Sequence, residues 1–255
     1  MKKSLKKILA HRKTYYSQNG EDGVLEYLLS KLPERDKWCV EFGAWDGKYL
    51  SNTYHFLSNS GYAGVLIEGD TPKAELLKAN MKEFNTICIN KYIDMNGANS
   101  LDNILSQTPI PNEFDLLSID VDGNDYHIWQ SLETYHPKIV IIEINVLDKP
   151  DIERINTPNS PFVMGVSGTS IKSMTELASL KGYRLVANVS CNAIYVKEKY
   201  YDLFHDSFMS PSTVFLYEGH DVKDLTLKEL RNLSWRRLLK GMLRAGGFQA
   251  FRKAN

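Results

Sequence analysis

The stretch Trp38-Cys39-Val40-Glu41-Phe42-Gly43-Ala44-Trp45-Asp46-Gly47 decides the fold. An apolar run of strand length leads directly into a turn with two glycines, and such a turn lets a ligand lie against bare backbone. The G-x-x-x-G spacing differs from the G-x-G-x-x-G pattern that holds a dinucleotide pyrophosphate at a helix end. The segment predicts a strand that ends at a ligand pocket, with an ordinary strand-to-helix turn as the alternative.

Short apolar runs and amphipathic stretches alternate along the rest of the chain, as in parallel βα units. The expected strands are 38–42, 63–67, 86–93, 114–119, 139–144, 184–189 and 193–196. The expected helices lie near 20–32, 51–59, 71–82, 99–106, 124–133 and 169–181. Only the turn Ser190-Cys191-Asn192 separates the last two strands, which predicts an antiparallel hairpin. We therefore expect an α/β fold with a Rossmann-like sheet of seven strands, the last of them antiparallel.

The composition is that of one globular domain, with 255 residues of which 43% are apolar and 24% charged. No apolar run approaches the roughly 20 residues that span a bilayer, and the N-terminal residues lack a signal-peptide core, so we expect a cytoplasmic protein. The cysteines Cys39, Cys88 and Cys191 are far apart in apolar stretches. This predicts free thiols rather than disulfides or a zinc site.

The net charge of zero hides basic ends and an acidic body. Residues 1–13 hold six Lys and Arg and residues 231–255 hold seven, with no acid in either segment. Thirteen of the 31 basic residues thus lie at the ends, which leaves 18 against 31 acidic residues in the body. An acidic body argues against nucleic acid as a partner.

The ends also set the expected domain organisation. We expect a basic N-terminal extension over 1–14, a main domain over 15–200 and a C-terminal extension over 201–255. Residues 233–251 have the spacing of a basic amphipathic helix. We expect this helix to dock on the acidic body or on a second subunit of a homodimer, with the periphery of an anionic membrane as the alternative.

Acidic residues at the strand ends suit a nucleoside that carries positive charge. Glu41 ends the first expected strand, where its carboxylate would attract the ammonium and sulfonium of S-adenosylmethionine. Glu68 ends the second strand, a position from which a carboxylate takes both hydroxyls of a ribose. Asp94, after the third strand, suits an adenine amino group, although an Asn-Gly turn with a helix cap at Asn99 explains the same residues.

Three carboxylates and a histidine follow the fourth strand in Ile119-Asp120-Val121-Asp122-Gly123-Asn124-Asp125-Tyr126-His127. Such crowding is costly unless a cation or a substrate resolves it. Asp122 and His127 are the candidate general bases, because an imidazole accepts a proton readily near neutral pH. A purely structural histidine on the following helix is the alternative.

A metal site is a further hypothesis. Glu143 and Asn145 point to one face at the end of the fifth strand, because side chains alternate along a strand. Asp120 and Asp122 follow the neighbouring fourth strand, so Asp120, or Asp122 in its place, would join Glu143 and Asn145 in offering oxygen ligands to Mg²⁺ or Mn²⁺. The alternative is that these groups form hydrogen bonds without a metal.

Several of these motifs occur together in an order that resembles the FkbM-like S-adenosylmethionine-dependent methyltransferase family, over roughly residues 15–198. They are Tyr16-Ser17-Gln18-Asn19-Gly20-Glu21-Asp22-Gly23, the Glu41 to Gly47 turn, Ser51-Asn52-Thr53, Leu66-Ile67-Glu68-Gly69-Asp70, the Ile119 to Tyr126 segment and Gly182-Tyr183-Arg184-Leu185-Val186. The resemblance implies a class I methyltransferase sheet and O-methylation of a sugar or another small polar acceptor of surface polysaccharide or secondary metabolism. We expect the cofactor to be bound by Gln18, Glu41, Gly43, Asn52, Glu68, Asp94 and Asp120.

Other functions stay open at this point. A nicotinamide-dependent oxidoreductase shares the ribose-binding acid, but the missing G-x-G-x-x-G motif opposes it. Methylation of nitrogen or of a phosphoryl group is a second alternative, and a non-catalytic partner module is a third. Residues 145–168 form a long polar stretch that we expect to act as a substrate lid, over an acceptor such as a nucleotide-linked sugar.

Overall fold

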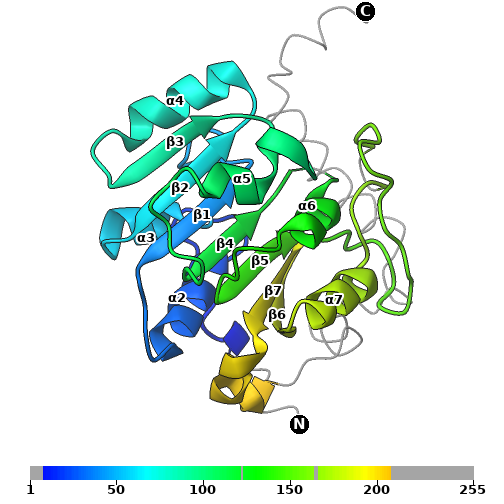
Figure 1. Ribbon diagram of the computed structural model, residues 1–255. Helices are drawn as coiled ribbons and strands as arrows, with labels where there is room; N and C mark the ends of the chain where they lie inside the picture. Colours follow the sequence, from blue (N-terminus) through cyan, green and yellow to red (C-terminus); the bar gives the residue numbers. More distant parts are fainter. Residues whose placement is uncertain (1–7, 122, 164–165, 208–255) are drawn as a thin grey trace, which may run out of the picture.

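The structure is a computed structural model that describes residues 8–121, 123–163 and 166–207. Figure 1 shows a central sheet with helices on both faces. The strands are β1 (Trp38–Phe42), β2 (Ala63–Glu68), β3 (Thr86–Asn90), β4 (Leu116–Ile119), β5 (Ile139–Glu143), β6 (Tyr183–Val189) and β7 (Asn192–Lys197). The helices are α2 (Glu21–Lys31), α3 (Tyr54–Asn59), α4 (Thr71–Met81), α5 (Leu101–Leu105), α6 (Asp125–Ser131) and α7 (Ile171–Leu180), with 3-10 helices η1 (Gly97–Asn99) and η2 (Glu198–Ser207).

The strand order is β3-β2-β1-β4-β5-β7-β6. All neighbours from β3 to β5 pair in parallel, whereas β7 is antiparallel to both β5 and β6. The seven strands and the antiparallel β7 are confirmed. The chain runs outward from β1 to β3 on one side and then returns to β4 on the other, so the carboxyl ends of β1 and β4 mark the switch point where such sheets bind ligands.

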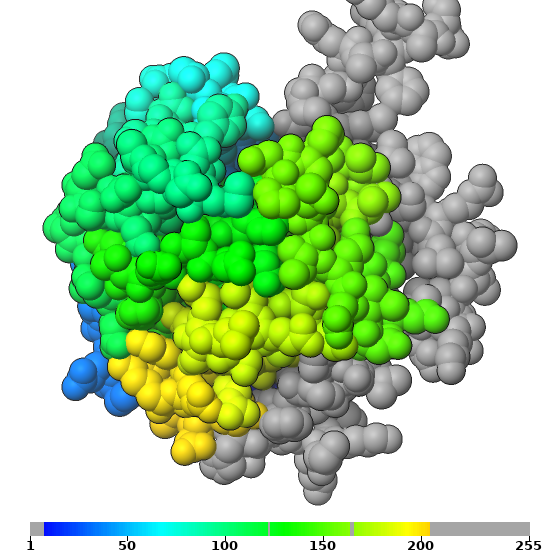
Figure 2. Space-filling model, turned by 45° about the vertical axis from the view of Figure 1, so that its right-hand side comes forward, coloured from blue at the N-terminus to red at the C-terminus, as the bar shows by residue number. Residues whose placement is uncertain are grey.

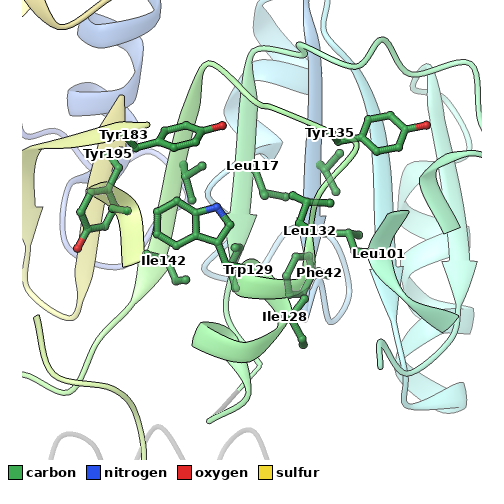
Figure 3. Close-up of a cluster of buried hydrophobic side chains, with 14 of the residues drawn as sticks. Phe42, Leu101, Leu117, Ile128, Trp129, Leu132, Tyr135, Ile142, Tyr183 and Tyr195 are labelled. Carbon is green, nitrogen blue, oxygen red and sulfur yellow. The ribbon is translucent and has the colours of Figure 1, made fainter. Parts of the chain in front are cut away.

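Two helical layers cover the sheet because successive strand residues face opposite sides. Helices α5, α6 and α7 pack on one face, and α2, α3 and α4 pack on the other. Figure 3 shows the first of these cores around Trp129 of α6. Its ring centroid lies 5.6 Å from that of Tyr183 and 5.4 Å from that of Tyr195, so α6 is fixed against the hairpin side of the sheet.

Two element boundaries, the start of α3 and the end of β3, differ from expectation, and both lie at the carboxyl edge of the sheet. Helix α3 begins at Tyr54 rather than near residue 51, because the hydroxyls of Ser51 and Thr53 donate to Glu41 Oε2. Strand β3 ends at Asn90 rather than at residue 93. The residues just beyond β3 line a cavity instead, as described below.

Several expectations concern the ends of the chain. The basic helix expected at 233–251 and residues 1–7 lie outside the described residues. The domain boundaries at 14 and 200 stay predictions, although Ile8 and Leu9 are buried against the α2 face. All three cysteines are free, with Cys88 half-buried and the other two buried. No helix in the described part of the chain has the length and apolar character needed to cross a membrane.

Candidate functional site

A cavity of about 280 Å³ opens at the carboxyl ends of β1, β2 and β4. Its walls come from the loop after β1, the β2–α4 turn, the segment after β3 and the end of β4. The lining residues are Glu41, Phe42, Gly43, Ala44, Trp45, Tyr49, Leu50, Ser51, Asn52, Ile67, Glu68, Gly69, Asp70, Lys73, Lys91, Tyr92, Ile93, Asp120 and Val121. Five of the seven residues predicted to bind the cofactor are among them: Glu41, Gly43, Asn52, Glu68 and Asp120.

Glu41 organises the floor of this cavity. Its Oε2 accepts hydrogen bonds from the hydroxyls of Ser51 at 2.6 Å and Thr53 at 2.7 Å, and its Oε1 accepts from the Asn52 backbone amide at 2.9 Å. The Asn52 side chain then donates to the Ser118 hydroxyl of β4 at 3.1 Å. Burial raises the pKa of Glu41, and the three donors oppose that shift. The carboxylate therefore fixes the loop of residues 51–53 across β1 and β4, and Glu41 is one of the residues that line the cavity.

Gly43 brings the β1 turn against the end of β4. It has φ +71°, and a Cβ placed on it would lie 1.9 Å from the Asp120 carbonyl oxygen. No side chain fits at that separation, so only a glycine lets the β1 turn come this close to the backbone of Asp120. The opening sequence segment predicts that a ligand lies against this backbone, and that stays a prediction.

Glu68 holds two loops at the end of β2. Its Oε2 accepts from the Trp45 amide and its Oε1 from the Asp70 amide, both at 2.8 Å. A carboxylate oxygen has two acceptor positions, so each oxygen keeps capacity for one further donor. Two vicinal hydroxyls of a ribose are donors of that kind, and Glu68 lines the cavity where they would lie.

Sequence reasoning missed the aromatic and basic part of the wall. Trp45 and Tyr49 pack edge to face with ring centroids 4.7 Å apart, and Tyr92 and two lysines line the side toward β3. Trp45 has φ 48° and Leu50 has φ 56°, so this loop holds two non-glycine residues in the left-handed region. Strain of this kind clusters at functional sites. The only sign of these wall residues in the sequence is that each lies a few residues after the end of a strand.

Two predicted cofactor-binding residues lie away from the cavity lining. Asp94 is exposed, and its amide donates to the Asn99 carbonyl in the turn that contains η1. Its neighbours Tyr92 and Ile93 line the cavity in its place. Gln18 is exposed in the loop before α2, where Asp22 Oδ2 accepts from the amides of residues 15–17.

The predicted metal ligands are divided between two environments. In the sheet register, Ile119 of β4 pairs with Ile142 of β5, so Asp120 and Glu143 follow at neighbouring strand ends. Asn145 is buried, and its Nδ2 donates to the carbonyls of residues 166 and 167 while its Oδ1 accepts from the Leu147 amide. Among the described residues, no three His, Cys, Asp or Glu side chains gather closely enough to hold a metal ion. The metal hypothesis therefore gains no support.

The two predicted bases also differ. Asp122 lies outside the described residues. His127 is on α6, and its Nε2 lies 2.7 Å from the Asn156 carbonyl oxygen rather than in the cavity wall. Between them, Asp125 is buried and accepts from the Val121 and Gly123 amides, both at 2.9 Å. Burial, together with the charge of Asp120, raises the pKa of Asp125 to about 6.

Comparison with known proteins gives distant structural likenesses. No protein-family model matches the chain, and no curated protein sequence does. The chain is similar to a TehB-like S-adenosylmethionine-dependent methyltransferase from Corynebacterium glutamicum, with 14% identity and a TM-score of 0.42 over 75% of this chain and 93% of that one. It is also similar to the N-terminal domain of EvdMO1 in the presence of S-adenosylhomocysteine and D-fucose, with 11% identity and a TM-score of 0.45 over 77% and 95%. A precorrin-6y C5,15-methyltransferase from Geobacter metallireducens gives 13% identity and a TM-score of 0.41 over 72% and 93%.

The strand order with its antiparallel β7 is that of the Rossmann-like class I methyltransferase sheet. The likenesses to solved structures are too distant to carry a function.

Proposed function

We propose that the chain is an S-adenosylmethionine-dependent methyltransferase that acts on a small polar acceptor. The observation that carries the proposal is the cavity at the β1–β4 switch point, which Glu41, Glu68 and Asp120 line together with Gly43. A nucleoside with an ammonium and a sulfonium matches these groups, because the ribose finds an acceptor carboxylate and the positive charges find carboxylates nearby.

In this reaction the protein mainly positions the cofactor and the acceptor. S-adenosylmethionine supplies a methyl group bonded to a positively charged sulfur. An acceptor oxygen attacks that carbon from the side opposite sulfur, the C–S bond breaks and its electron pair stays on sulfur, and the acceptor proton passes to a base or to water. We place the acceptor beside the ends of β4 and β5, and we assign the base to a carboxylate of the turn between β4 and α6. Asp122 remains the candidate.

The substrate class is part of the proposal. The order of motifs along the chain supports an FkbM-like enzyme. Asp120, which lines the cavity, and Glu143, at the neighbouring strand end, are acceptors that suit the hydroxyl groups of an acceptor molecule. We therefore favour O-methylation of a sugar, free or linked to a nucleotide. Methylation of nitrogen or of a phosphoryl group is the second candidate.

Binding of the reaction product tests the proposal. S-adenosylhomocysteine should raise the melting temperature of the protein, and NAD⁺ at the same concentration should not. The reverse result would identify a nicotinamide-dependent oxidoreductase and overturn the proposal.

Variants of Glu68 then locate the site. Glu68→Ala should weaken binding of S-adenosylhomocysteine by about tenfold or more, because it removes a charged acceptor for the ribose and releases the Trp45 and Asp70 amides. Glu68→Gln keeps the size of the side chain and should also weaken binding. Glu75→Ala on the exposed face of α4 is the control and should bind normally. Unchanged affinity in both Glu68 variants, measured by calorimetry, would place the ribose elsewhere.

A further inference from the structure

Residues 146–163, which we name the strap, cross the surface beside α6 without entering the core. No side chain of the strap is buried. Val146 at its start packs partly against the core, whereas the larger apolar side chains beyond it are exposed by 40 to 52%: Leu147, Ile152, Ile155, Phe162 and Val163. In Figure 2 the yellow-green strap lies on the surface beside the bright green region of α6. Apolar burial therefore does little to hold the strap, and its position depends on polar contacts.

One of these contacts defines the state of His127. Its Nε2 lies 2.7 Å from the backbone carbonyl oxygen of Asn156 in the strap. A carbonyl oxygen can only accept, so Nε2 carries the hydrogen and donates it. The imidazole that sequence reasoning offered as a base is thus a hydrogen-bond donor to the strap.

Further contacts attach the strap to the turn between β4 and α6. Asn156 Nδ2 donates to the Gly123 carbonyl at 3.0 Å. Asn124 and Asn159 form a reciprocal pair, in which Asn124 Nδ2 donates to Asn159 Oδ1 at 3.0 Å and the Asn159 amide donates to Asn124 Oδ1 at 2.9 Å. The strap thus meets this turn and α6 at three places. It also contacts α7 and the residues just before it through residues 153, 154 and 156.

The same turn forms part of the cavity wall. Asp120 and Val121 line the cavity, and Asp125 fixes the turn by accepting from the Val121 and Gly123 amides. A shift of the strap would therefore pull on the backbone that carries Asp120. Residues that line the cavity and residues that hold the strap therefore lie on either side of one short turn.

We infer that His127 and Asn156 are positioning residues that clip the strap to the cavity wall, so that ligand binding in the cavity and order in the strap are coupled. The inference rests on the proposed function for its ligand, S-adenosylhomocysteine. The clip itself does not depend on that ligand. With the clip closed, the strap stands beside the ends of β4 and β5, where the acceptor is proposed to bind.

Hydrogen exchange of residues 155–163 tests the clip in the full chain. His127→Ala and Asn156→Ala should each speed exchange in this segment by about tenfold, on the strength of one or two lost hydrogen bonds. His127→Gln should restore slow exchange, because its amide donates from a position close to that of Nε2 but cannot act as a base. His136→Ala, at an exposed histidine remote from the strap, is the matched control and should exchange as the wild type does.

The coupling has its own readout. S-adenosylhomocysteine should slow exchange in 155–163 in the wild type and in His127→Gln, and should fail to do so in His127→Ala. Strap exchange that is the same in His127→Ala and the wild type would overturn the clip, and so would a His127→Gln variant that exchanges like the alanine variant. If S-adenosylhomocysteine does not bind the wild type at all, the proposed function fails, while the exchange of the ligand-free variants still decides the clip.

Discussion

At the scale of single residues, the close approach at Gly43 makes the sharpest prediction. Gly43→Ala forces a Cβ to within 1.9 Å of the Asp120 carbonyl oxygen, so the β1 turn and the end of β4 must separate. We expect a loss of about 2–4 kcal/mol in the free energy of unfolding, from the strained φ together with the clash, and a loss of S-adenosylhomocysteine binding. Urea denaturation and calorimetry measure the two effects.

Gly182→Ala separates the clash from the backbone strain. Gly182 has φ +77°, close to the +71° of Gly43, but a Cβ there meets nothing within 4 Å. This control should cost only about 1 kcal/mol and should leave ligand binding intact. Equal effects of the two substitutions would mean that the approach to Asp120 has no part in either stability or binding.

Residue positions could be predicted better than residue contacts. Because parallel strands end together, the sequence predicts Glu41, Glu68 and Asp120 at one edge of the sheet, and the cavity includes all three. The hydroxyl donors that surround Glu41 were not predicted, since they depend on how the chain turns between β1 and α3. Periodicity determines the face on which a side chain lies, but not the partner that it meets there.

At the scale of elements, Asp125 at the start of α6 makes the stability of the protein depend on pH. Burial and the charge of Asp120 raise its pKa to about 6, above the ordinary value near 4. Between these values the native state binds more protons than the unfolded chain, so the free energy of unfolding falls as the pH rises. The stability that comes from proton binding at Asp125 is fully present below about pH 4 and is lost by about pH 7. A pKa difference of two units corresponds to about 3 kcal/mol of this stability.

Asp125→Asn isolates the pH-dependent stability that arises from Asp125, because an amide resembles the protonated carboxyl and does not titrate. The stability of the variant relative to the wild type should therefore rise by about 3 kcal/mol between pH 4 and pH 7, whatever its value at pH 4. Denaturation at both pH values measures the difference, in which the other titrating groups cancel. A difference that stays constant over this range would show that Asp125 titrates normally in the folded protein.

The elements themselves were predictable because their signals are local. Alternating apolar runs located all seven strands, and the short turn at Ser190 predicted the antiparallel β7. The start of α3 was wrong by three residues because the tertiary contacts of Ser51 and Thr53 with Glu41 override the local pattern. The path of residues 146–163 had no local signal, since contacts with α6 and the turn before it determine that path.

At the scale of the whole molecule, we expect the carboxyl and amino edges of the sheet to contribute to different properties, the first to ligand binding and the second to stability. The carboxyl edge holds the cavity. At the amino edge, residues that come just before β1, β2, β4 and β5 form a buried polar network around Asp115. Asp115 Oδ1 contacts Lys138 Nζ at 2.7 Å, and its Oδ2 accepts from the Tyr62 hydroxyl at 3.0 Å and the Lys37 amide at 3.1 Å. Lys138 also contacts Asp36 at 3.0 Å.

Asp115→Asn should therefore weaken the fold without touching the site. Asp115 is 0% and Lys138 5% exposed, so the substitution leaves a buried ammonium with only the partly exposed Asp36 as its charge partner. Breaking a buried pair costs about 3–5 kcal/mol, which for a domain of this size lowers the melting temperature by roughly 6–20 °C. Below the new transition, the affinity for S-adenosylhomocysteine should stay within about twofold of the wild type, because additivity holds for distant sites. A variant that keeps its melting temperature, or that loses affinity while still folded, would show that the two edges of the sheet are not separate in this way.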